Sequence, residues 1–300
     1  MARKVKSTSS VKRGTVEGPR DSVRPLLTYL HGIMASLNAA DRLIAECVLA
    51  DPEKVVTSPI AEIKRLSGAS VGSIVGFCRR LGLSGFADFK IALARDLAQS
   101  GLPAGGTMQR NSSLFEEVFD FHARSLAETL RINTQATVER VAHVLAKARR
   151  IEFFSIGFSY PVAYTASCKL LLIGLPAAAQ ADSHIQLISA TQLKEGDVAF
   201  GISCSGTTRE TVQCLEVAKA KGALTVCLTN AMRSPITACS ELCLYATPSE
   251  VKYFQAPLAS RVTQLAVIDA LFVSLALKLK NQTAERLQQS GEEVSKRRLS

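Results

Sequence analysis

Short apolar runs alternate with helix-like patterns through the second half of this chain, and this alternation is what most constrains its fold. Runs of this kind are typical of strands buried on both faces. Strands that alternate with helices form a parallel sheet covered by helices. The sequence therefore predicts an α/β domain with a parallel sheet of about five strands flanked by helices. The predicted strands are residues 151–156, 177–181, 198–203, 224–229 and 242–246, and a helix from about 258 to 287 closes the domain.

The first third of the chain carries only helix-like patterns, in which apolar residues recur every three or four positions from Leu26 to Leu37 and beyond. Residues 1–100 hold 15 Lys and Arg against 9 Asp and Glu, so this part carries more than half of the net charge of +10. A basic helical domain favours a polyanion as its partner, although solvated basic faces are common.

Two short helices, predicted over residues 58–66 and 70–81, have the dimensions of a helix-turn-helix. Ser58 and Ser70 are the expected N-caps, and Gly68 makes the turn between the helices. In this geometry the start of the second helix lies nearest the base edges, and basic residues at its end reach phosphates. Any three-helix bundle contains such a pair, so the pattern alone leaves a purely structural bundle open. The predicted DNA-binding residues are Ser70, Val71, Gly72, Ser73, Arg79 and Arg80.

A hydroxyl-rich loop directly follows the third predicted strand, with the sequence Ser203-Cys204-Ser205-Gly206-Thr207-Thr208. An amphipathic helix begins after it, so the loop presents free backbone N–H groups at the positive end of a helix dipole. Hydroxyls and a glycine backbone that a ligand can approach closely suit a phosphate ester better than a bare metal or a hydride carrier. An ordinary polar loop with a capping serine is the alternative.

A second loop, Gly157-Phe158-Ser159, follows the first predicted strand and opens a helix that Ser159 is expected to cap. The loop lacks the G-x-G-x-x-G pattern, so it is not a dinucleotide fingerprint. The eight cysteines include no C-x-x-C pair and mostly stand in apolar runs, so we expect them to fill space and to bind no metal. The sequence predicts no cofactor.

Several motifs of the first third form a recognisable set: Asn38-Ala39-Ala40-Asp41, Ser58-Pro59-Ile60-Ala61-Glu62-Ile63, Phe77-Cys78-Arg79-Arg80-Leu81-Gly82 and Gly85-Phe86-Ala87-Asp88-Phe89-Lys90. Together they resemble the N-terminal domain of RpiR-type bacterial transcription regulators. The resemblance implies a helix-turn-helix that binds operator DNA. One residue departs from the family pattern, because Gly76 stands where an arginine usually precedes the phenylalanine. We therefore expect DNA binding that is weaker, or that reads a different site.

The two loops, together with Ser234-Pro235 and Ser260-Arg261-Val262-Thr263-Gln264, resemble SIS (sugar isomerase) domains over about residues 113–285. In such domains Gly-x-Ser and Ser-x-Ser-Gly-x-Thr hold the phosphate of a phosphosugar. The resemblance implies a SIS-type parallel sheet. It also implies these ligand-binding residues: Gly157, Ser159, Ser203, Ser205, Gly206 and Thr208. Arg261 and Glu250 are expected to meet sugar hydroxyls or a neighbouring subunit, or to form structural salt bridges.

These observations give the expected organisation: a basic arm (residues 1–20), a helix-turn-helix domain (21–98), a linker (99–112), a SIS domain (113–287) and a tail (288–300) whose residues 296–298 are expected to be loose. We interpret the chain as a transcription regulator, not an enzyme, whose binding to operator DNA is controlled by a sugar phosphate. A homodimer or homotetramer is expected, because paired recognition helices read paired half-sites. The alternative is a phosphosugar isomerase with an accessory helical domain, but no Glu–His pair stands out beside the loops to move a proton.

The expected location is the cytoplasm, without membrane contact. The N-terminus is basic and polar and lacks the apolar segment of a signal peptide. The longest apolar stretch, residues 265–279, contains Asp269 and Lys278 and is shorter than the roughly 20 apolar residues of a membrane span. It is predicted to be a core helix.

Overall fold

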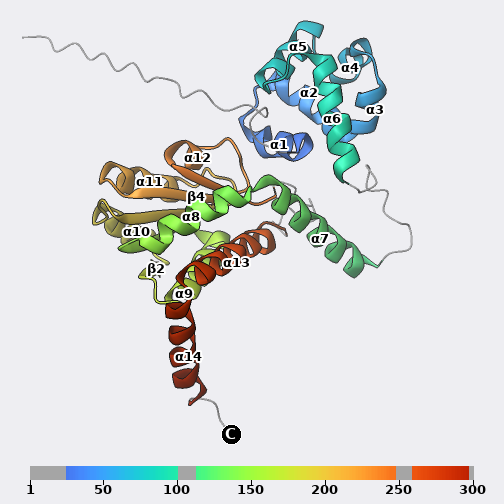
Figure 1. Ribbon diagram of the computed structural model, residues 1–300. Coiled ribbons are helices and arrows are strands. Elements are labelled where there is room, and N and C mark those ends of the chain that lie inside the picture. Colours follow the sequence, from blue (N-terminus) through green and yellow to red (C-terminus); the bar gives the residue numbers. More distant parts are fainter. Residues whose placement is uncertain (1–24, 101–112, 248–258, 297–300) are drawn as a thin grey trace, which may run out of the picture.

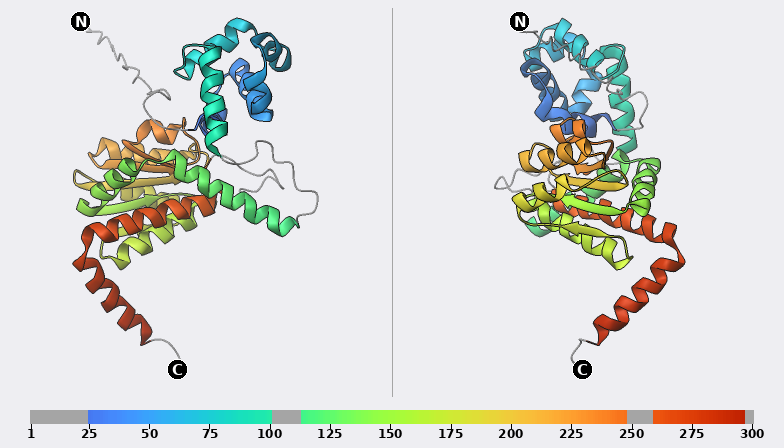
Figure 2. Two further views of the ribbon diagram at one scale, coloured as in Figure 1. Left: turned by 45° about the vertical axis from the view of Figure 1, so that its right-hand side comes forward. Right: turned by 90° about the vertical axis from the view of Figure 1, so that its left-hand side faces the viewer.

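The computed structural model describes residues 25–100, 113–247 and 259–296. The predicted basic arm, most of the predicted linker and Glu250 lie outside the described residues. Figure 1 shows a helical N-terminal region next to an α/β region, and Figure 2 shows helix α14 pointing away from the body of the molecule.

The described part of the N-terminal region consists of helices around one apolar core. Phe77 and Phe89, whose ring centroids are 6.2 Å apart, are buried in it together with Leu30, Ile44 and Ile74. Burial of such side chains, at about 1.5–3 kcal/mol each, holds the helices together. The helices are α1 (Leu26–Ile33), α2 (Ala39–Ala50), α3 (Pro52–Thr57), α4 (Ile60–Ser67), α5 (Val71–Arg80) and α6 (Phe86–Ser100), with a 3₁₀ turn (Met34–Ser36) after α1.

The two helices of the predicted helix-turn-helix are present as α4 and α5. Ser70 caps α5 as expected, because its Oγ accepts a hydrogen bond from the N–H of Ser73 at 3.0 Å. Ser58 does not cap α4, and that prediction is wrong. Its N–H donates to the carbonyl of Lys54 and so belongs to the end of α3, while α4 starts only after the extended Pro59. Gly68, at φ +71°, makes the left-handed turn between the helices.

The α/β region contains one parallel five-stranded sheet with the order β2-β1-β3-β4-β5. The strands are β1 (Arg150–Phe154), β2 (Ala177–Ala179), β3 (Asp197–Ser203), β4 (Leu224–Thr229) and β5 (Leu242–Tyr245), so all five predictions are confirmed within two residues at each end. The chain runs from β1 outward to β2, returns to β3 beside β1, and then continues outward to β4 and β5. The order therefore reverses between β1 and β3.

Helices cover both faces of the sheet, as the apolar runs predict. The helices of this region are α7 (Leu114–Ile132), α8 (Gln135–Lys147), α9 (Tyr160–Leu172), α10 (Ser183–Thr191), α11 (Arg209–Ala220), α12 (Pro235–Cys239), α13 (Ala259–Leu279) and α14 (Asn281–Ser295). Side chains of α8, α9 and α13 share one core with Phe153 and Phe200. Side chains of α10, α11 and α12 share a second core with Phe154 and Ala199. Neighbouring strand residues point to opposite faces, which separates the two cores.

A glycine in the middle of β3 lets helix α11 lie close to the sheet. A Cβ atom on Gly201 would lie 2.7 Å from Cδ1 of Leu215 and 3.1 Å from Cδ1 of Ile236. Both of those side chains are fully buried, so they have little room to withdraw. The absence of a side chain at Gly201 therefore sets how close α11 and α12 come to the strand.

The C-terminal helix is broken in two where the sequence predicts one helix to about residue 287. Helix α13 ends at Leu279, and Lys280 has φ +41°, which is rarely populated by residues other than glycine. Helix α14 then continues to Ser295, so the predicted tail (288–300) is helical over most of its described part, and residues 297–300 lie outside the described residues. By length and composition alone, α13 could cross a membrane. In the structure its Ile268, Leu271 and Leu275 lie in the main core of the sheet domain, as predicted for a core helix.

Candidate functional site

The two predicted loops meet at the carboxyl edge of the sheet, where the strand order reverses. β1 and β3 are direct neighbours, with Phe154 paired to Gly201. The loop after β1 forms a 3₁₀ turn (Gly157–Ser159) that leads into α9, and the loop after β3 leads into α11. Open α/β sheets bind their ligands at this kind of switch point. The topology therefore brings both loops to the place where a ligand is expected.

The loop from Ser203 to Thr208, which we call the hydroxyl loop, is held in shape by its own side chains. The Oγ of Ser203 accepts a hydrogen bond from the N–H of Gly206 at 3.1 Å and lies 3.0 Å from the Oγ1 of Thr208. Gly206 has φ +65°, which turns the loop in the left-handed region. Ser203 is buried, whereas Ser205 is exposed. The loop thus combines one anchored hydroxyl with one that faces solvent.

Helix α11 begins directly after this loop, and within the part of the chain that the structure describes no side chain hydrogen-bonds to its first N–H groups. Thr208 occupies the N-cap position, but its side chain makes no capping hydrogen bond. The N–H groups of the first helical turn have no partner within a helix and carry the positive end of the dipole. They are donors for an anion, which favours the ligand interpretation over the ordinary capped loop.

The loop after β1 has similar features. Gly157 has φ +60° and is exposed, and Ser159 is the N-cap residue of α9. The predicted cap by Ser159 is wrong, because its side chain makes no capping hydrogen bond and its backbone is already helical (φ −85°, ψ −18°). A cap needs an extended backbone that turns the hydroxyl back over the helix end. The hydroxyl of Ser159 therefore has no capping role in this structure.

Ser155 joins the two loops below the edge of the sheet. Its Oγ donates to the carbonyl of Ile202 at 2.9 Å, and its backbone N–H donates to Oε1 of Gln186 at 3.1 Å. Both Ser155 and Gln186 are buried. This link fixes the spacing of the strand ends from which the loops start. Neither residue stands in a motif that marks it as part of a site.

Arg261 lies beside the first loop, at the start of α13. The centre of its guanidinium is 5.3 Å from the centroid of the Phe158 ring. Cation–π contacts of this kind are worth about 0.5–1 kcal/mol at exposed sites. Arg261, which the sequence predicts beside the ligand, thus lies next to the loop after β1. Glu250, which is predicted with it, lies outside the described residues.

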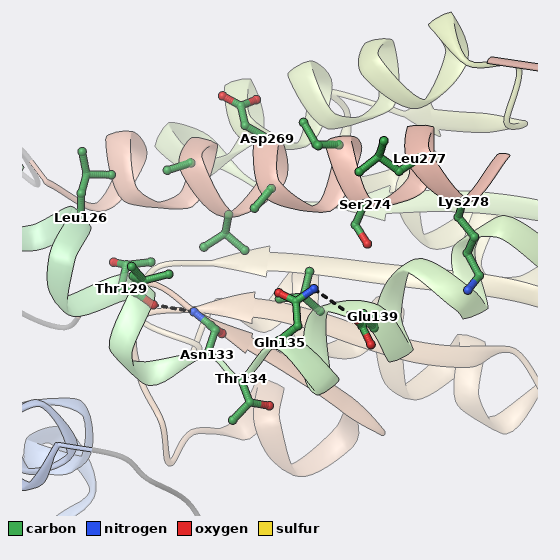
Figure 3. Close-up of a pocket in the computed structure, with 16 residues that line it drawn as sticks. Leu126, Thr129, Asn133, Thr134, Gln135, Glu139, Asp269, Ser274, Leu277 and Lys278 are labelled. Atoms are coloured by element: carbon green, nitrogen blue, oxygen red, sulfur yellow. Dashed lines mark hydrogen bonds between the residues drawn. The ribbon is translucent and has the colours of Figure 1, made fainter. Parts of the chain in front are cut away.

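A large apolar groove lies away from both loops. It lies between α13 and helices α7 and α8, has a volume of about 970 Å³, and is lined by apolar side chains such as Val138, Val267 and Val273. Figure 3 shows Leu126 near one end of the groove and Lys278 near the other. It shares no residue with the hydroxyl loop or with the loop after β1. An apolar groove of this kind suits an apolar surface better than a phosphate.

The predicted DNA-binding residues lie together on α5, but they differ in how free they are. Ser70 and Ser73 bond to each other at the helix start, and Val71 and Gly72 beside them are exposed. At the other end Arg79 is exposed, and its guanidinium makes no hydrogen bond or ion pair within the described residues. Arg80 instead forms an ion pair with Asp41 of α2. Only Arg79 of the two arginines therefore has a guanidinium that is free to contact a phosphate.

Comparison with known proteins finds two family models and several relatives. Residues 25–100 match the helix-turn-helix domain of the rpiR family, and residues 144–274 match the SIS domain. An uncharacterized HTH-type transcriptional regulator of Caldanaerobacter subterraneus subsp. tengcongensis is 33% identical over 277 residues, which cover 91% of this chain and 98% of the relative. HTH-type transcriptional regulator HexR of Pseudomonas aeruginosa is 30% identical over 259 residues, which cover 85% of this chain and 90% of HexR.

A solved structure resembles the chain over nearly its whole length. The Vibrio vulnificus NanR protein, complexed with ManNAc-6P, superposes with a TM-score of 0.60 at 26% identity. The match covers 91% of this chain and 99% of NanR. Similarity therefore extends over the helical region and the sheet together.

Proposed function

Since this chain belongs to the RpiR-type family of helix-turn-helix regulators with a SIS domain, we propose that it is a transcription regulator whose operator binding is controlled by a phosphorylated sugar. The proposal of a phosphorylated effector depends on one observation, the hydroxyl loop at the β1–β3 switch point, which is followed by the uncapped start of α11. Hydroxyls and helix N–H groups can neutralise a phosphate ester without a buried lysine. The phosphosugar bound to NanR supports the same class of ligand.

We assign the effector phosphate to both loops. The proposed ligands are Gly157, Ser159, Ser203, Ser205, Gly206 and Thr208. Ser205 and the exposed Gly157 are open to a ligand as they stand. Ser203 and Thr208 bond to each other, so a phosphate that binds both would have to divide or replace that hydrogen bond. Binding is therefore expected to change the shape of the hydroxyl loop.

We assign operator contact to the exposed face of α5. Ser70, Val71, Gly72 and Ser73 would approach the base edges, and Arg79 a phosphate. The ion pair with Asp41 argues that Arg80 acts mainly by fixing the end of α5. The domain limits proposed for these tasks are residues 21–98 and 113–287.

A phosphosugar isomerase remains the second candidate because the sheet domain carries the SIS fold. Isomerisation needs a base placed to remove a proton beside the carbonyl. Within the described residues, no carboxylate or imidazole hydrogen-bonds to the hydroxyls of Ser159, Ser203, Ser205 or Thr208. The relatives named as transcriptional regulators are what favours a sensor over an enzyme. An assay with hexose and pentose phosphates decides it, because turnover well above background would establish the enzyme.

We further propose a homo-oligomer, located in the cytoplasm. Large apolar side chains of α7 and α13 are exposed beside the groove, among them Phe119, Leu130 and Leu277. An exposed apolar patch of this kind marks an association surface. A second copy would cover it and pair the two recognition helices. Light scattering coupled to size exclusion measures the subunit count directly, and a monomer at micromolar concentration would exclude this surface as the interface.

The function as a whole is tested by a thermal-shift panel of sugar phosphates followed by DNA binding. A ligand that binds only the folded state increases the free energy of unfolding, by about 2.7 kcal/mol when its concentration is a hundred times its Kd. The melting temperature therefore rises. The panel contains glucose 6-phosphate, fructose 6-phosphate, arabinose 5-phosphate and N-acetylmannosamine 6-phosphate, with unphosphorylated glucose as the control. The strongest stabiliser is then added to a binding assay with a duplex that the protein has selected from a random-sequence pool. No shift with any phosphate, or a shift without any change in DNA affinity, would contradict the proposal.

A further inference from the structure

A buried contact joins the helical region to the sheet domain beside the end of β4. The N–H of Met232 donates a hydrogen bond to the carbonyl of Gly32, in α1, at 2.9 Å. The Met232 side chain is only 6% exposed and is part of the apolar core of the helical region. A Cβ atom on Gly32 would lie 2.7 Å from Cγ of Met232. The two segments therefore touch closely, backbone against backbone.

The next residue extends the contact. The guanidinium of Arg233 lies 5.7 Å from the centroid of the Tyr29 ring, also on α1. Both Nε of Arg233 and the hydroxyl of Tyr29 are buried and have no hydrogen-bond partner within the described residues. Buried polar atoms without partners cost about 1–3 kcal/mol each. This part of the interface therefore lacks hydrogen bonds for two buried polar atoms. A second placement of α1 that gave both atoms partners could have a free energy close to that of the placement seen here.

The same segment is bonded at both ends to the hydroxyl loop. The N–H of Asn230 donates to the carbonyl of Cys204 at 3.1 Å, and the N–H of Ile236 donates to the carbonyl of Gly206 at 3.0 Å. Ser234 packs so closely that a Cβ atom on Gly206 would lie 2.2 Å from its Oγ. The hydroxyl loop cannot shift without pushing this segment.

The segment is also braced internally. The Oγ of Ser234 donates to the carbonyl of Ala231 at 3.1 Å, and the N–H of Ser234 donates to the Oγ1 of Thr237 at 3.1 Å. The side chain of Asn230 is held by Gln264 of α13, whose Nε2 donates to its Oδ1 at 2.8 Å. A braced turn transmits a displacement, whereas a loose one would absorb it.

We propose that residues 230–236, here the coupling segment, carry the effector signal from the hydroxyl loop to α1 and so to the DNA-binding helices. This inference rests on the proposed function and names its route. A phosphate that changes the Ser203–Thr208 hydrogen bond moves the carbonyls of Cys204 and Gly206, to which the segment is bonded. Met232 passes that movement to Gly32, because it lies in the core of the helical region. The effector then favours one placement of the DNA-binding helices through its different affinity for the two arrangements.

The test uses the full chain, the strongest stabiliser of the panel as probe, and the selected duplex. Gly32→Ala is the first variant, because alanine favours the helix itself and the atoms nearest to its Cβ are those of Met232. Met232→Ala is the second, and it removes the contact from the other side. In the wild type we expect the probe to change the Kd for DNA by about 5–150-fold, the usual range of allosteric coupling. In both variants we expect a change of less than about twofold, with the Kd for the probe itself unaltered.

Two controls make the outcome specific. Gly291→Ala is a helical glycine-to-alanine change with nothing within 4 Å of the new Cβ, and it should respond like the wild type. Met232→Leu keeps the buried apolar volume and should recover most of the response that Met232→Ala loses. Coupling is reciprocal, so the duplex should also cease to alter the affinity for the probe in the two test variants.

The results separate this inference from the proposed function. A wild type whose DNA affinity ignores every phosphate of the panel contradicts both. A wild type that responds, with Gly32→Ala and Met232→Ala responding equally, contradicts the coupling segment alone. Loss of probe binding in Gly32→Ala would also overturn it, because the segment would then act on the site and not between the sites.

Discussion

Arg80 at the end of α5 is joined to Asp41 near the start of α2 by a two-point ion pair. The Nε of Arg80 donates to Oδ2 of Asp41 at 2.8 Å, and its Nη2 donates to Oδ1. Asp41 is only 4% exposed and also accepts a hydrogen bond from Nδ2 of Asn38 at 3.0 Å. The pair ties the recognition helix to a helix 39 positions earlier in the chain. It gives neighbouring arginines of one motif different tasks.

The two arginines are therefore expected to respond differently to substitution. Arg79→Ala should weaken DNA binding and lower the slope of log Kd against log salt by about 1, because one phosphate contact is lost. Its melting temperature should match that of the wild type. Arg80→Ala leaves the buried Asp41 carboxylate unpaired and should lower stability by about 1–3 kcal/mol, with its DNA affinity affected through the position of α5. Titrations at several salt concentrations and thermal melts distinguish these effects; identical salt slopes for both variants would reverse the assignment.

Gly76→Arg should tighten DNA binding. Position 76 is half-buried on α5, and a Cβ there would lie 3.2 Å from Nη1 of Arg80, on the far end of a flexible side chain. Replacing glycine inside a helix also stabilises it by roughly 1 kcal/mol. The new charge should steepen the salt dependence of binding by about one phosphate contact. Gly76→Gln serves as the uncharged control. Equal affinities for the glycine, glutamine and arginine proteins would place the position away from the duplex.

Ser203→Ala combined with Ser205→Ala should abolish the response to sugar phosphate while DNA binding without effector persists. The first change removes the acceptor for the N–H of Gly206, and the second removes the exposed hydroxyl of the loop. The two changes remove the hydrogen bonds of the Ser203 Oγ with Gly206 and Thr208 and those of the Ser205 Oγ with Thr207, at about 1 kcal/mol each, so a thermal melt without effector first checks that the variant is folded. The thermal shift with the panel is the measurement. Ser290→Ala, on α14, is the matched control. A normal shift in the double variant would remove the site assignment.

Two buried cysteines should resist alkylation in the native protein. Burial raises the pKa of the Cys78 and Cys214 thiols to about 11. Since the thiolate is the reactive form, only about one thiol in a thousand is reactive at pH 8, and raising the pH to 9 should speed native labelling about tenfold. In urea both residues should label rapidly as their pKa returns to the ordinary value. Mass spectrometry of iodoacetamide adducts provides the measurement. Equal native and denatured rates would show that these side chains are not enclosed.

The sequence predicts the sheet and the shared edge of the two polar loops well, because both depend on local patterns. Apolar runs locate all five strands, and the polar residues that end β1 and β3 must share an edge once the strands are parallel. The break at Lys280 has no such signal: no glycine or proline stands near it, and α13 simply ends where its core contacts end.

Local sequence patterns also cannot predict contacts between residues that are far apart in the chain. Arg80 with Asp41, and Met232 with Gly32, depend on how finished elements pack, and nothing in the neighbouring residues announces them. Ser58 and Ser159 show the converse error. Each has the residue type of a helix cap, but the backbone around it places the hydroxyl elsewhere.

Position 201 is sensitive to substitution even though Gly201 is not one of the proposed ligand-binding residues. It lies inside the sheet, yet its lack of a side chain determines how close α11 lies to β3, and therefore where the start of α11, to which the effector phosphate is assigned above as a proposal, is placed. A genetic screen for cells that no longer respond to the proposed effector should therefore recover Gly201→Ala or Gly201→Ser alongside changes in the loop itself. Position 201 lies outside the proposed ligand residues, so contacts to the effector alone would not identify it.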